Sequence, residues 1–322
     1  MDKIPSNNKI TIIIPRLPNN TSGNALETLK KTSYPKKQIE VIIAKGLNPS
    51  RQRNQAIGQA KNNIIFFFDD DAEIPPDYIE KALKHYNSED IDALGGPVET
   101  SKNDKFLQKC FGYVIGSYFA TQAMSNKFHG TGSVRKATEK ELILCNFSIR
   151  QAALGKHRFD ERLYPNEENE LFNRLMAEGK KFLYDPTLKV YRKQRESIGK
   201  FAKQFYKYGY GRVEHLIIRP SSASPIFFIP PLFISYIAAL IVFALLGNIA
   251  FIHTIPLVLY IMITLVNSAK VAYSTKDART LLVTPWLFLI VHASYGVGMI
   301  TSLLNFKRKN RPKEVEIEKI RL

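Results

Sequence analysis

Cysteine is scarce in this chain of 322 residues, where Cys110 and Cys145 are the only two. They form no CxxC pair, so the sequence indicates neither a disulfide framework nor a zinc site. Two isolated cysteines are most simply interpreted as small buried apolar residues. The first residues, MDKIPSNNKI, also lack the apolar run of a signal peptide. We therefore expect the N-terminal domain to stay in the cytoplasm.

Acidic residues are few relative to basic ones, with 29 Asp and Glu against 46 Lys and Arg, which gives a net charge of +17. Such a charge is compatible with nucleic acid, an anionic membrane surface or anionic substrates. The basic residues are dispersed, apart from clusters beside apolar runs, and form no stripe with a reading element. We expect a partner other than nucleic acid.

Long apolar runs are absent before about Pro220 and numerous after it. The runs Ile226–Leu246, Asn248–Val266 and Leu281–Leu304 each have about the length that spans a bilayer. Buried core helices are the alternative, but a core helix usually keeps one polar face. Three crossings would place the basic segment after Asn305 outside, against the positive-inside rule. The sequence thus predicts two or three crossings, with one run re-entrant or interfacial if the number is two.

Three short β-branched or aromatic runs, Lys9–Pro15, Glu40–Ala44 and Ile64–Phe68, read as buried strands. Helical segments separate them, among them Ser50–Ala60 with Ser50 near its N-cap. Alternating strands and helices predict an α/β domain with a Rossmann-like mixed sheet, mostly parallel. Further strands are expected at Glu141–Arg150, Lys181–Tyr184 and Lys189–Arg192, and a helix is expected at Glu167–Glu178.

The third strand runs directly into Asp69, Asp70 and Asp71. Three adjacent carboxylates repel one another, and a divalent cation such as Mg²⁺ or Mn²⁺ relieves the repulsion while leaving positions for substrate phosphates. Asp69 and Asp71 point to one side of an extended segment, at the strand end where α/β sheets bind ligands. The alternative is a solvated acidic turn. We interpret the triplet as a metal and diphosphate site.

The run PSRQRNQAIGQAKNNIIFFFDDDAEIPPDYIEKAL resembles the donor-binding half of family-2 inverting glycosyltransferases with the GT-A fold. The later run CNFSIRQAAL…FDERLYPNEENELFNRLMAEGKKFLYDP resembles their acceptor half. Membrane-bound enzymes of the succinoglycan type are the most similar, and the resemblance extends from about Lys9 to Gly211. It implies a GT-A catalytic domain, a nucleotide-sugar donor and a divalent cation as cofactor.

The resemblance also implies roles for individual residues. Asp69 and Asp71 match the DxD element that binds metal and, through it, the donor diphosphate, and Asp70 matches a ribose or sugar contact. The remaining donor-binding candidates are Pro15, Arg51, Arg53, Asn54, Arg192, Gln204 and Lys207. For Arg51 and Arg53 a solvated helix face is an equal alternative.

The family places an acidic pair at the start of a helix, and Glu167 and Glu168 match it here. Inverting transfer needs a carboxylate that accepts the proton of the attacking hydroxyl. Glu168 occupies the position of the family's aspartate and is the expected base, with Glu167 next. Carboxylates also stabilise a helix N-terminus, which is the alternative explanation.

Two family elements are altered in this chain. The usual QxxRW motif reads Gln204-Phe205-Tyr206-Lys207-Tyr208, so Lys207 keeps the charge but loses the bidentate fork of arginine. The alternative for this segment is an amphipathic interfacial helix. Arg192 stands near the position where relatives often place a metal-binding histidine; it cannot ligate metal, but it can pair with phosphate.

The predicted order is a glycosyltransferase domain (1–195), an amphipathic interfacial segment (196–222), transmembrane helices (223–305) and a basic tail (306–322). The predicted activity is inverting transfer of a sugar from a nucleotide donor to a lipid-linked or polysaccharide acceptor at the plasma (inner) membrane, with the catalytic domain cytoplasmic. Alternatives are a processive polysaccharide synthase and a decayed glycan-binding relative. A nucleotidyltransferase is disfavoured because the first strand ends in Pro-Arg-Leu-Pro-Asn rather than a glycine-rich phosphate loop.

Overall fold

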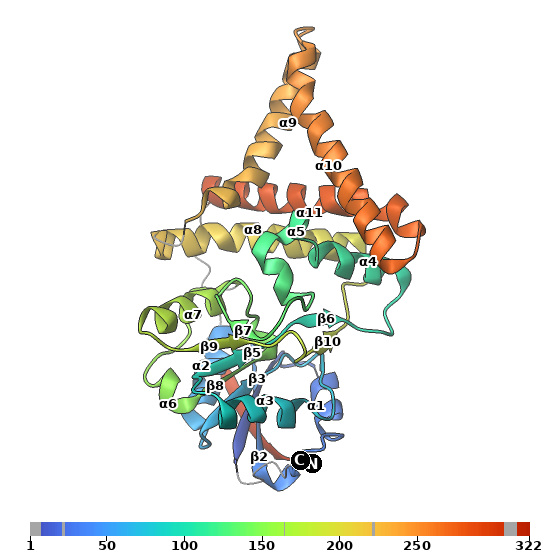
Figure 1. The fold of residues 1–322 in the computed structure, drawn as a ribbon. Helices are drawn as coiled ribbons and strands as arrows, with labels where there is room; N and C mark the ends of the chain where they lie inside the picture. The colour runs from blue at the N-terminus through green and yellow to red at the C-terminus, as the bar shows by residue number, and fades with distance from the viewer. Residues whose placement is uncertain (1–7, 21–22, 164, 221–222, 306–313) are drawn as a thin grey trace. The chain divides into compact units, whose positions relative to one another are not determined.

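The computed structural model describes residues 8–20, 23–163, 165–220, 223–305 and 314–322 (Figure 1). The chain forms two compact units. The first unit comprises residues 1–104, 123–193 and 309–322, and the second comprises residues 105–122 and 194–308. The predicted boundaries differ from this division in two places, because residues 105–122 join the second unit and the tail joins the first.

The first unit contains a mixed eight-stranded sheet in the order β11-β2-β1-β3-β8-β5-β9-β7. The pairings β2-β1, β1-β3 and β5-β9 are parallel, and the pairings β11-β2, β3-β8, β5-β8 and β7-β9 are antiparallel. The predicted mixed α/β sheet is confirmed, with a smaller parallel share than expected. The strands of this sheet are β1 (Ile10–Arg16), β2 (Ile39–Gly46), β3 (Ile64–Phe67), β5 (Ala93–Gly95), β7 (Arg135–Lys136), β8 (Phe147–Arg150), β9 (Phe182–Tyr184) and β11 (Val315–Arg321).

Alternation of side chains along the strands builds two cores. Ile12 and Ile14 join the cluster that contains Leu29 and Leu83, whereas Ile13 joins the cluster that contains Ile57 and Phe172. Each face of the sheet is therefore covered by helices, as buried β-branched strands require. The helices of this unit are α1 (Asn24–Leu29), α2 (Pro49–Gln59), α3 (Tyr78–Ser88), α6 (Gln151–Leu154) and α7 (Glu167–Ala177), with 3-10 turns η1 (Lys36–Gln38) and η3 (Leu144–Asn146).

A small second sheet has the strand order β4-β10-β6. Its strand β4 directly follows the acidic triplet in the sequence. Its strands are β4 (Ala72–Glu73), β10 (Val190–Arg192) and β6 (Val98–Thr100). The antiparallel register pairs Arg192 with Ala72. This pairing carries the end of β10 to the residue that follows Asp71.

Local predictions were wrong at two positions. Asn48, not Ser50, caps α2, because its side chain accepts a hydrogen bond from the backbone N–H of Arg51 at 3.3 Å. Pro49 then fits the first helical turn. Of the expected strand Glu141–Arg150, only the last four residues form β8, since a 3-10 turn precedes them.

The C-terminal tail is the largest departure from the predicted domain order. Residues Val315–Arg321 form β11, which pairs antiparallel with β2 from Val315 opposite Gly46 to Arg321 opposite Glu40. Lys45 is ion-paired with Glu316 at 3.2 Å and Glu318 at 3.0 Å across this pairing. Residues 315–321 are thus an edge strand of the eight-stranded sheet, and the basic segment 306–313 lies outside the described residues.

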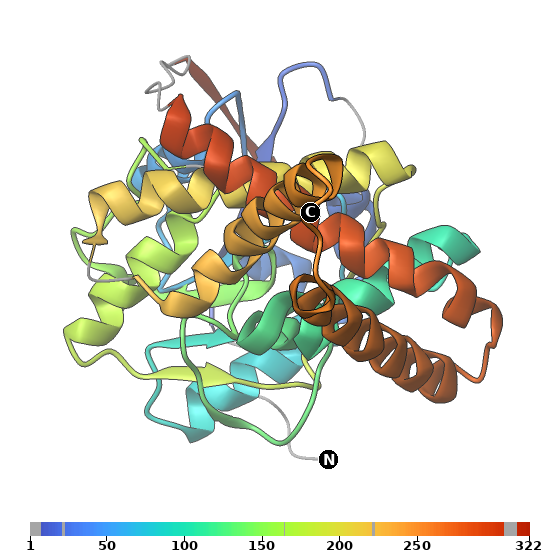
Figure 2. The same ribbon diagram turned by 90° about the horizontal axis from the view of Figure 1, so that it is seen from above.

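The second unit is helical (Figure 2). Backbones approach closely between α8 and α11, since a Cβ built on Gly209 would lie 2.1 Å from the carbonyl oxygen of Tyr295. A Cβ on Gly298 would likewise lie 2.2 Å from that of Tyr206. The helices are α4 (Phe106–Ile115), α5 (Tyr118–Thr121), α8 (Ile198–Ile218), η5 (Pro225–Phe228), α9 (Ile229–Leu245), α10 (Phe251–Thr275) and α11 (Arg279–Leu304). The 3-10 turn η2 (Gln122–Lys127) follows α5, and its residues after Gln122 belong to the first unit.

Three helical segments of the described chain are long and apolar enough to cross a membrane: Pro225–Leu245, Phe251–Thr275 and Arg279–Leu304. Their buried shares are 11%, 17% and 39%, so the last is far more enclosed by protein than the others. The predicted interfacial segment, residues 196–222, contains the helix α8, which begins at Ile198 and ends at Ile218.

Candidate active site

The parallel strands β1 and β3 bring the predicted donor residues to one edge of the sheet. Their register pairs Ile13 with Phe67, so Pro15 at the end of β1 and the acidic triplet after β3 follow the same strand ends. The backbone N–H of Phe68 also donates to the carbonyl of Ile13 at 3.2 Å. This carboxyl-end edge is where α/β sheets bind their ligands.

Arg192 lies between the outer aspartates of the triplet. Its Nε donates to Oδ2 of Asp71 at 2.8 Å, and its Nη1 donates to Oδ2 of Asp69 at 3.1 Å. The other oxygen of Asp71, Oδ1, is buried and has no hydrogen-bond partner among the described residues. Asp69 and Asp71 therefore converge as predicted, and the guanidinium screens their mutual repulsion.

Asp70 points elsewhere, as alternation along the segment predicts. Its Oδ2 accepts a hydrogen bond from Nδ2 of Asn20 at 2.6 Å. Burial raises the pKa of the Asp70 carboxyl, and the neighbouring charge of Asp71 raises it further. Asp70 is thereby separated from the pair that Arg192 holds.

Arg53 connects the acidic triplet to the acidic pair of α7. Its Nη2 donates to Oδ1 of Asp69 at 3.0 Å, and its Nη1 donates to Oε1 of Glu167 at 2.9 Å. Arg53 is only 5% exposed, which excludes the solvated helix face considered from sequence. The predicted donor and acceptor halves thus meet through one guanidinium.

Glu167 and Glu168 differ in environment although they are adjacent. The Glu167 side chain is buried, and burial, followed by the charge of Glu168, raises its pKa to about 7. The Glu168 side chain is 19% exposed and lies 4.0 Å from Nζ of Lys127. Solvent access is what a base that meets a hydroxyl substrate requires, and it favours Glu168 over Glu167.

Two basic residues that sequence reasoning missed lie near this pair. Lys127 is buried, and its Nζ also donates to Oδ1 of Asn169 at 2.9 Å, so it holds a positive charge beside Glu168. Arg174 donates to both oxygens of Glu170 at 2.8 Å and 2.9 Å. Only the spacing of Glu170 and Arg174, four residues apart on a helix, could have been found in the sequence.

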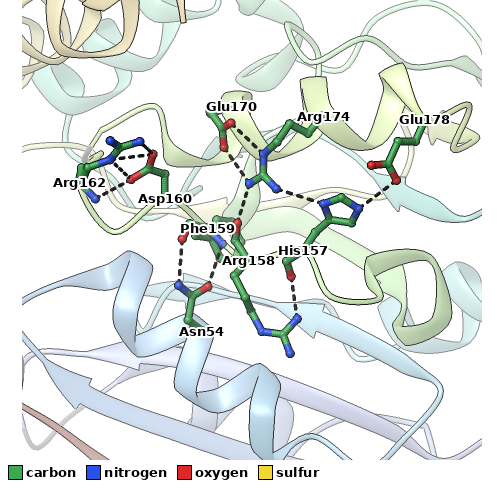
Figure 3. Close-up of polar contacts among 9 residues, drawn as sticks. All are labelled: Asn54, His157, Arg158, Phe159, Asp160, Arg162, Glu170, Arg174 and Glu178. Carbon is green, nitrogen blue, oxygen red and sulfur yellow. Dashed lines mark hydrogen bonds and ion pairs between the residues drawn. The ribbon is translucent and has the colours of Figure 1, made fainter. Parts of the chain in front are cut away.

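The segment before α7 is fixed by a polar network (Figure 3). Nη2 of Arg174 donates to the carbonyl of Arg158 at 2.6 Å, and His157 bridges Arg174 and Glu178. Asn54 is part of the same network: its Nδ2 donates to the carbonyl of Phe159 at 2.9 Å, and its Oδ1 accepts from the N–H of Phe159 at 2.8 Å. This network positions the start of the helix that carries the acidic pair.

Of the predicted donor residues on α2, only Arg53 contacts the acidic triplet in the described contacts. Arg51 is ion-paired with Glu161 at 2.7 Å and is one quarter exposed. Asn54 is engaged with the backbone of Phe159, which suggests a positioning role, whereas Arg53 reaches the triplet. The assignment of Arg51 and Asn54 to the donor stays a prediction.

Arg16, the last residue of β1, is a further candidate that the sequence did not reveal. It is 7% exposed, and its Nε and Nη2 are buried without a hydrogen-bond partner among the described residues. A buried guanidinium with unfilled donors is costly unless an anion or carbonyl completes it. Its charge also lowers the pKa of Asp70, the weakest of several influences on that carboxyl.

Gln204 and Lys207 belong to the second unit. Gln204 accepts a hydrogen bond from Nε of Arg195 at 2.8 Å and donates to the hydroxyl of Tyr208 at 3.0 Å. Both residues lie on α8, so the predicted motif is helical. Their contact with the donor stays a prediction.

The sequence of residues 64–300 matches glycosyl transferase family group 2. The chain belongs to this family. It is accordingly a glycosyltransferase, and the predicted family and enzyme class are confirmed. The matched range includes the acidic triplet, the acidic pair and the apolar helices.

Solved structures agree with the fold. A mannosyltransferase from Pyrobaculum calidifontis, PcManGT, in complex with GDP-Man and Mn²⁺, has a TM-score of 0.61 at 14% identity, over 93% of this chain and 88% of that one. TarS of S. aureus in complex with UDP-GlcNAc has a TM-score of 0.45 at 13% identity, over 96% of both chains. The chain matches no curated protein sequence. The GT-A fold predicted from sequence is thus confirmed.

Proposed function

We propose that this family-2 glycosyltransferase transfers a sugar, with inversion, from a nucleotide-sugar donor to a lipid-linked or polysaccharide acceptor at a membrane. The observation that carries the proposal is the Arg53 bridge, which holds Asp69 and Glu167 on one guanidinium. A donor diphosphate at the triplet would therefore be adjacent to the acidic pair that serves the acceptor. The succinoglycan-type relationship remains part of the proposal.

The residues present fit a divalent cation that is bound together with the donor. Asp69 and Asp71 supply hard oxygen ligands, and the buried Oδ1 of Asp71 has an unused lone pair. Among the described residues, no cluster of three or more Asp, Glu, His or Cys side chains could hold a metal alone. Water and donor phosphates would complete the coordination, as is usual for Mg²⁺. The mannosyltransferase neighbour, whose structure is a complex with GDP-Man and Mn²⁺, supports this assignment.

Asp69 and Asp71 would hold the cation, and when bound it neutralises charge on the departing nucleoside diphosphate. Arg192 would turn from the aspartates toward a phosphate oxygen, where its planar fork binds bidentately. Arg16 would donate to a donor oxygen at the end of β1. The chain's own cations thus surround the site that the leaving diphosphate would take.

Glu168 would accept the proton from the acceptor hydroxyl as its oxygen attacks the anomeric carbon from the face opposite the leaving group. One displacement of this kind inverts the configuration. Lys127 Nζ lies 4.0 Å from Glu168 and places a positive charge beside the proposed base. Glu167, buried and tied to Arg53, would orient the start of α7.

The apolar helices support membrane attachment. A catalytic unit tethered beside a membrane-embedded acceptor meets it at a raised effective concentration. The basic residues around the apolar runs favour a cytoplasmic catalytic unit by the positive-inside rule. We propose the plasma (inner) membrane as the location.

The experiment is transfer by the full chain purified in detergent. It is given a panel of nucleotide sugars, Mn²⁺ and polyprenyl-linked saccharides, and the anomeric configuration of the product is read by NMR. Transfer with inversion is expected for at least one donor. A retained configuration would contradict the single-displacement mechanism, and donor binding without transfer to any glycan would favour a decayed relative.

A further inference from the structure

We propose that the chain crosses the membrane twice, by a hairpin of α9 and α10, while α11 lies on the side of the catalytic unit and does not cross. This inference rests on the membrane attachment proposed above and is independent of the catalytic activity. It also predicts where both ends of every apolar helix lie.

Strand β11 determines the parity of the crossings. Its seven residues pair with β2, so residues 315–321 lie on the same side of any membrane as the sheet they complete. The chain leaves the first unit after residue 193 and returns with β11. An even number of crossings must intervene, although three helices have sufficient length and apolarity.

Helix α11 is the one whose contacts forbid a crossing. At its first residue, the Arg279 guanidinium lies 4.6 Å from the ring of Phe106 on α4. In its middle, Nε2 of His292 is hydrogen-bonded to the carbonyl of Phe119 on α5 at 3.0 Å. At its end, the carbonyl of Asn305 accepts a hydrogen bond from the hydroxyl of Tyr210 on α8 at 3.3 Å.

These three contacting helices cannot themselves span a bilayer. Helices α4 and α5 belong to an excursion of residues 105–122, which leaves the first unit and returns to it. Two crossings need about 40 helical residues, more than twice that length. Helix α8 carries Lys200, Lys203 and Lys207 along its first half, and charges at the bilayer centre are costly.

The charged residues at the two ends of α11 also indicate that both ends lie on the same side of the membrane. Lys276 and Arg279 precede or begin it, and the sequence KRKNRPK follows Asn305. Basic residues at both ends are expected on the cytoplasmic side. Helix α11 is then an interfacial helix packed on α8, consistent with its larger buried share of 39%.

Helices α9 and α10 differ from α11 because the segment that connects them is uncharged and exposed. Their connection carries no charge, and the side chains beside it, Leu245 and Phe251, are both 82% exposed. The hairpin is joined internally, because the Tyr236 hydroxyl donates to the carbonyl of His253 at 2.7 Å. Pro225–Leu245 has 21 residues, about 31 Å as a helix, which matches the hydrocarbon thickness. Figure 1 shows α9 and α10 as a hairpin that projects away from α11.

Cysteine accessibility tests the topology. Single cysteines replace exposed residues in a chain whose native Cys110 and Cys145 are changed to alanine: Asn248→Cys at the hairpin tip, Lys276→Cys before α11, Arg321→Cys in β11 and Lys156→Cys as the catalytic-unit reference. A membrane-impermeant maleimide is applied to right-side-out and inside-out vesicles. A size-exclusion profile matching the wild type shows that each variant is folded.

We expect Asn248→Cys to be labelled from one side only and the other three variants from the opposite side only. Labelling of Lys276→Cys from the side opposite Arg321→Cys would mean that α11 crosses, which overturns the inference. Labelling of Asn248→Cys from the same side as Arg321→Cys, or from neither side, would overturn the hairpin crossing. Release of the wild-type chain by alkaline carbonate would instead refute the membrane attachment.

Discussion

Arg53 donates a hydrogen bond of 2.9 Å to Glu167, a residue 114 positions later in the chain. Both side chains are almost fully buried, at 6% and 5% exposure. The same guanidinium reaches Asp69, so the pair joins the helix that follows β2, the acidic triplet and the start of α7. A buried bridge of this kind fixes the distance between the two halves of the site, and its consequences are measurable.

Removing Arg53 alone should be strongly destabilising. Arg53→Met leaves Glu167 buried without its partner, which typically costs about 3–5 kcal/mol. Thermal unfolding in detergent should show a large fall in Tm, and the double variant Arg53→Met/Glu167→Met should recover much of it. The control is Arg51→Met on the same helix, which breaks a more exposed pair worth about 1 kcal/mol or less. Equal losses for Arg51→Met and Arg53→Met would contradict the bridging role.

Glu167 should make stability depend on pH. Its pKa in the folded chain is about 7, above its ordinary value of 4.5. The protonated form is therefore favoured by folding, so this contribution is complete below pH 4.5 and is lost as pH rises through about 7. Each pKa unit corresponds to about 1.4 kcal/mol. Tm should fall between about pH 5 and 8, and Glu167→Gln should flatten that profile; an unchanged profile would refute the raised pKa.

The proposed base gives a distinct kinetic result. Glu168→Gln removes proton acceptance while leaving the triplet intact, so kcat should fall by about 10²–10⁴-fold with donor binding unchanged. The comparison is Glu178→Gln at the other end of the same helix, with near wild-type turnover expected. Steady-state kinetics and donor titration separate the two effects. If Glu168→Gln retains full turnover, the base lies elsewhere, and Glu167 is the next candidate.

Arg16 should affect the binding of the donor rather than the rate of the chemical step. Hydrogen bonds to charged groups contribute about 1.5–3 kcal/mol, so Arg16→Gln should raise the donor KM by about tenfold or more. Its kcat should change little, and the donor-free Tm should not fall, because a buried cation with unfilled donors is removed. Arg162→Gln, at an exposed salt bridge, is the control. An unchanged donor KM for Arg16→Gln would exclude it from the donor site.

Local patterns were sufficient for much of the fold. The β-branched and aromatic runs predicted β1, β2 and β3 to within two residues, and the expected helix Glu167–Glu178 predicted α7. Short-range signals failed where a distant partner decides the structure. Residues 315–321 become a strand only because the edge of β2, about 270 residues earlier, accepts them. The turn at Leu144–Asn146 likewise interrupts a run whose composition suits a strand.

The same limit applies to the site. Asp69, Asp71, Glu167 and Glu168 were predictable because each pair is contiguous or nearly so in the sequence. Lys127 and Arg16 were not, because neither belongs to a motif and their importance arises from burial beside other charges. Arg53 was predicted as a donor contact, yet its partner Glu167 could not be read from spacing.

Donor binding at the acidic triplet is the measurement that tests this account most directly. Isothermal titration of the purified full chain with nucleotide sugars and Mn²⁺ is compared with the same titration of Asp71→Asn and of Asp77→Asn, an exposed aspartate that directly precedes α3. The wild type and Asp77→Asn should bind at least one donor with a Kd between about 1 μM and 1 mM, the range of typical KM values. Asp71→Asn should lose metal-dependent binding. Failure of the wild type to bind any donor, or equal binding by Asp71→Asn, would contradict the account.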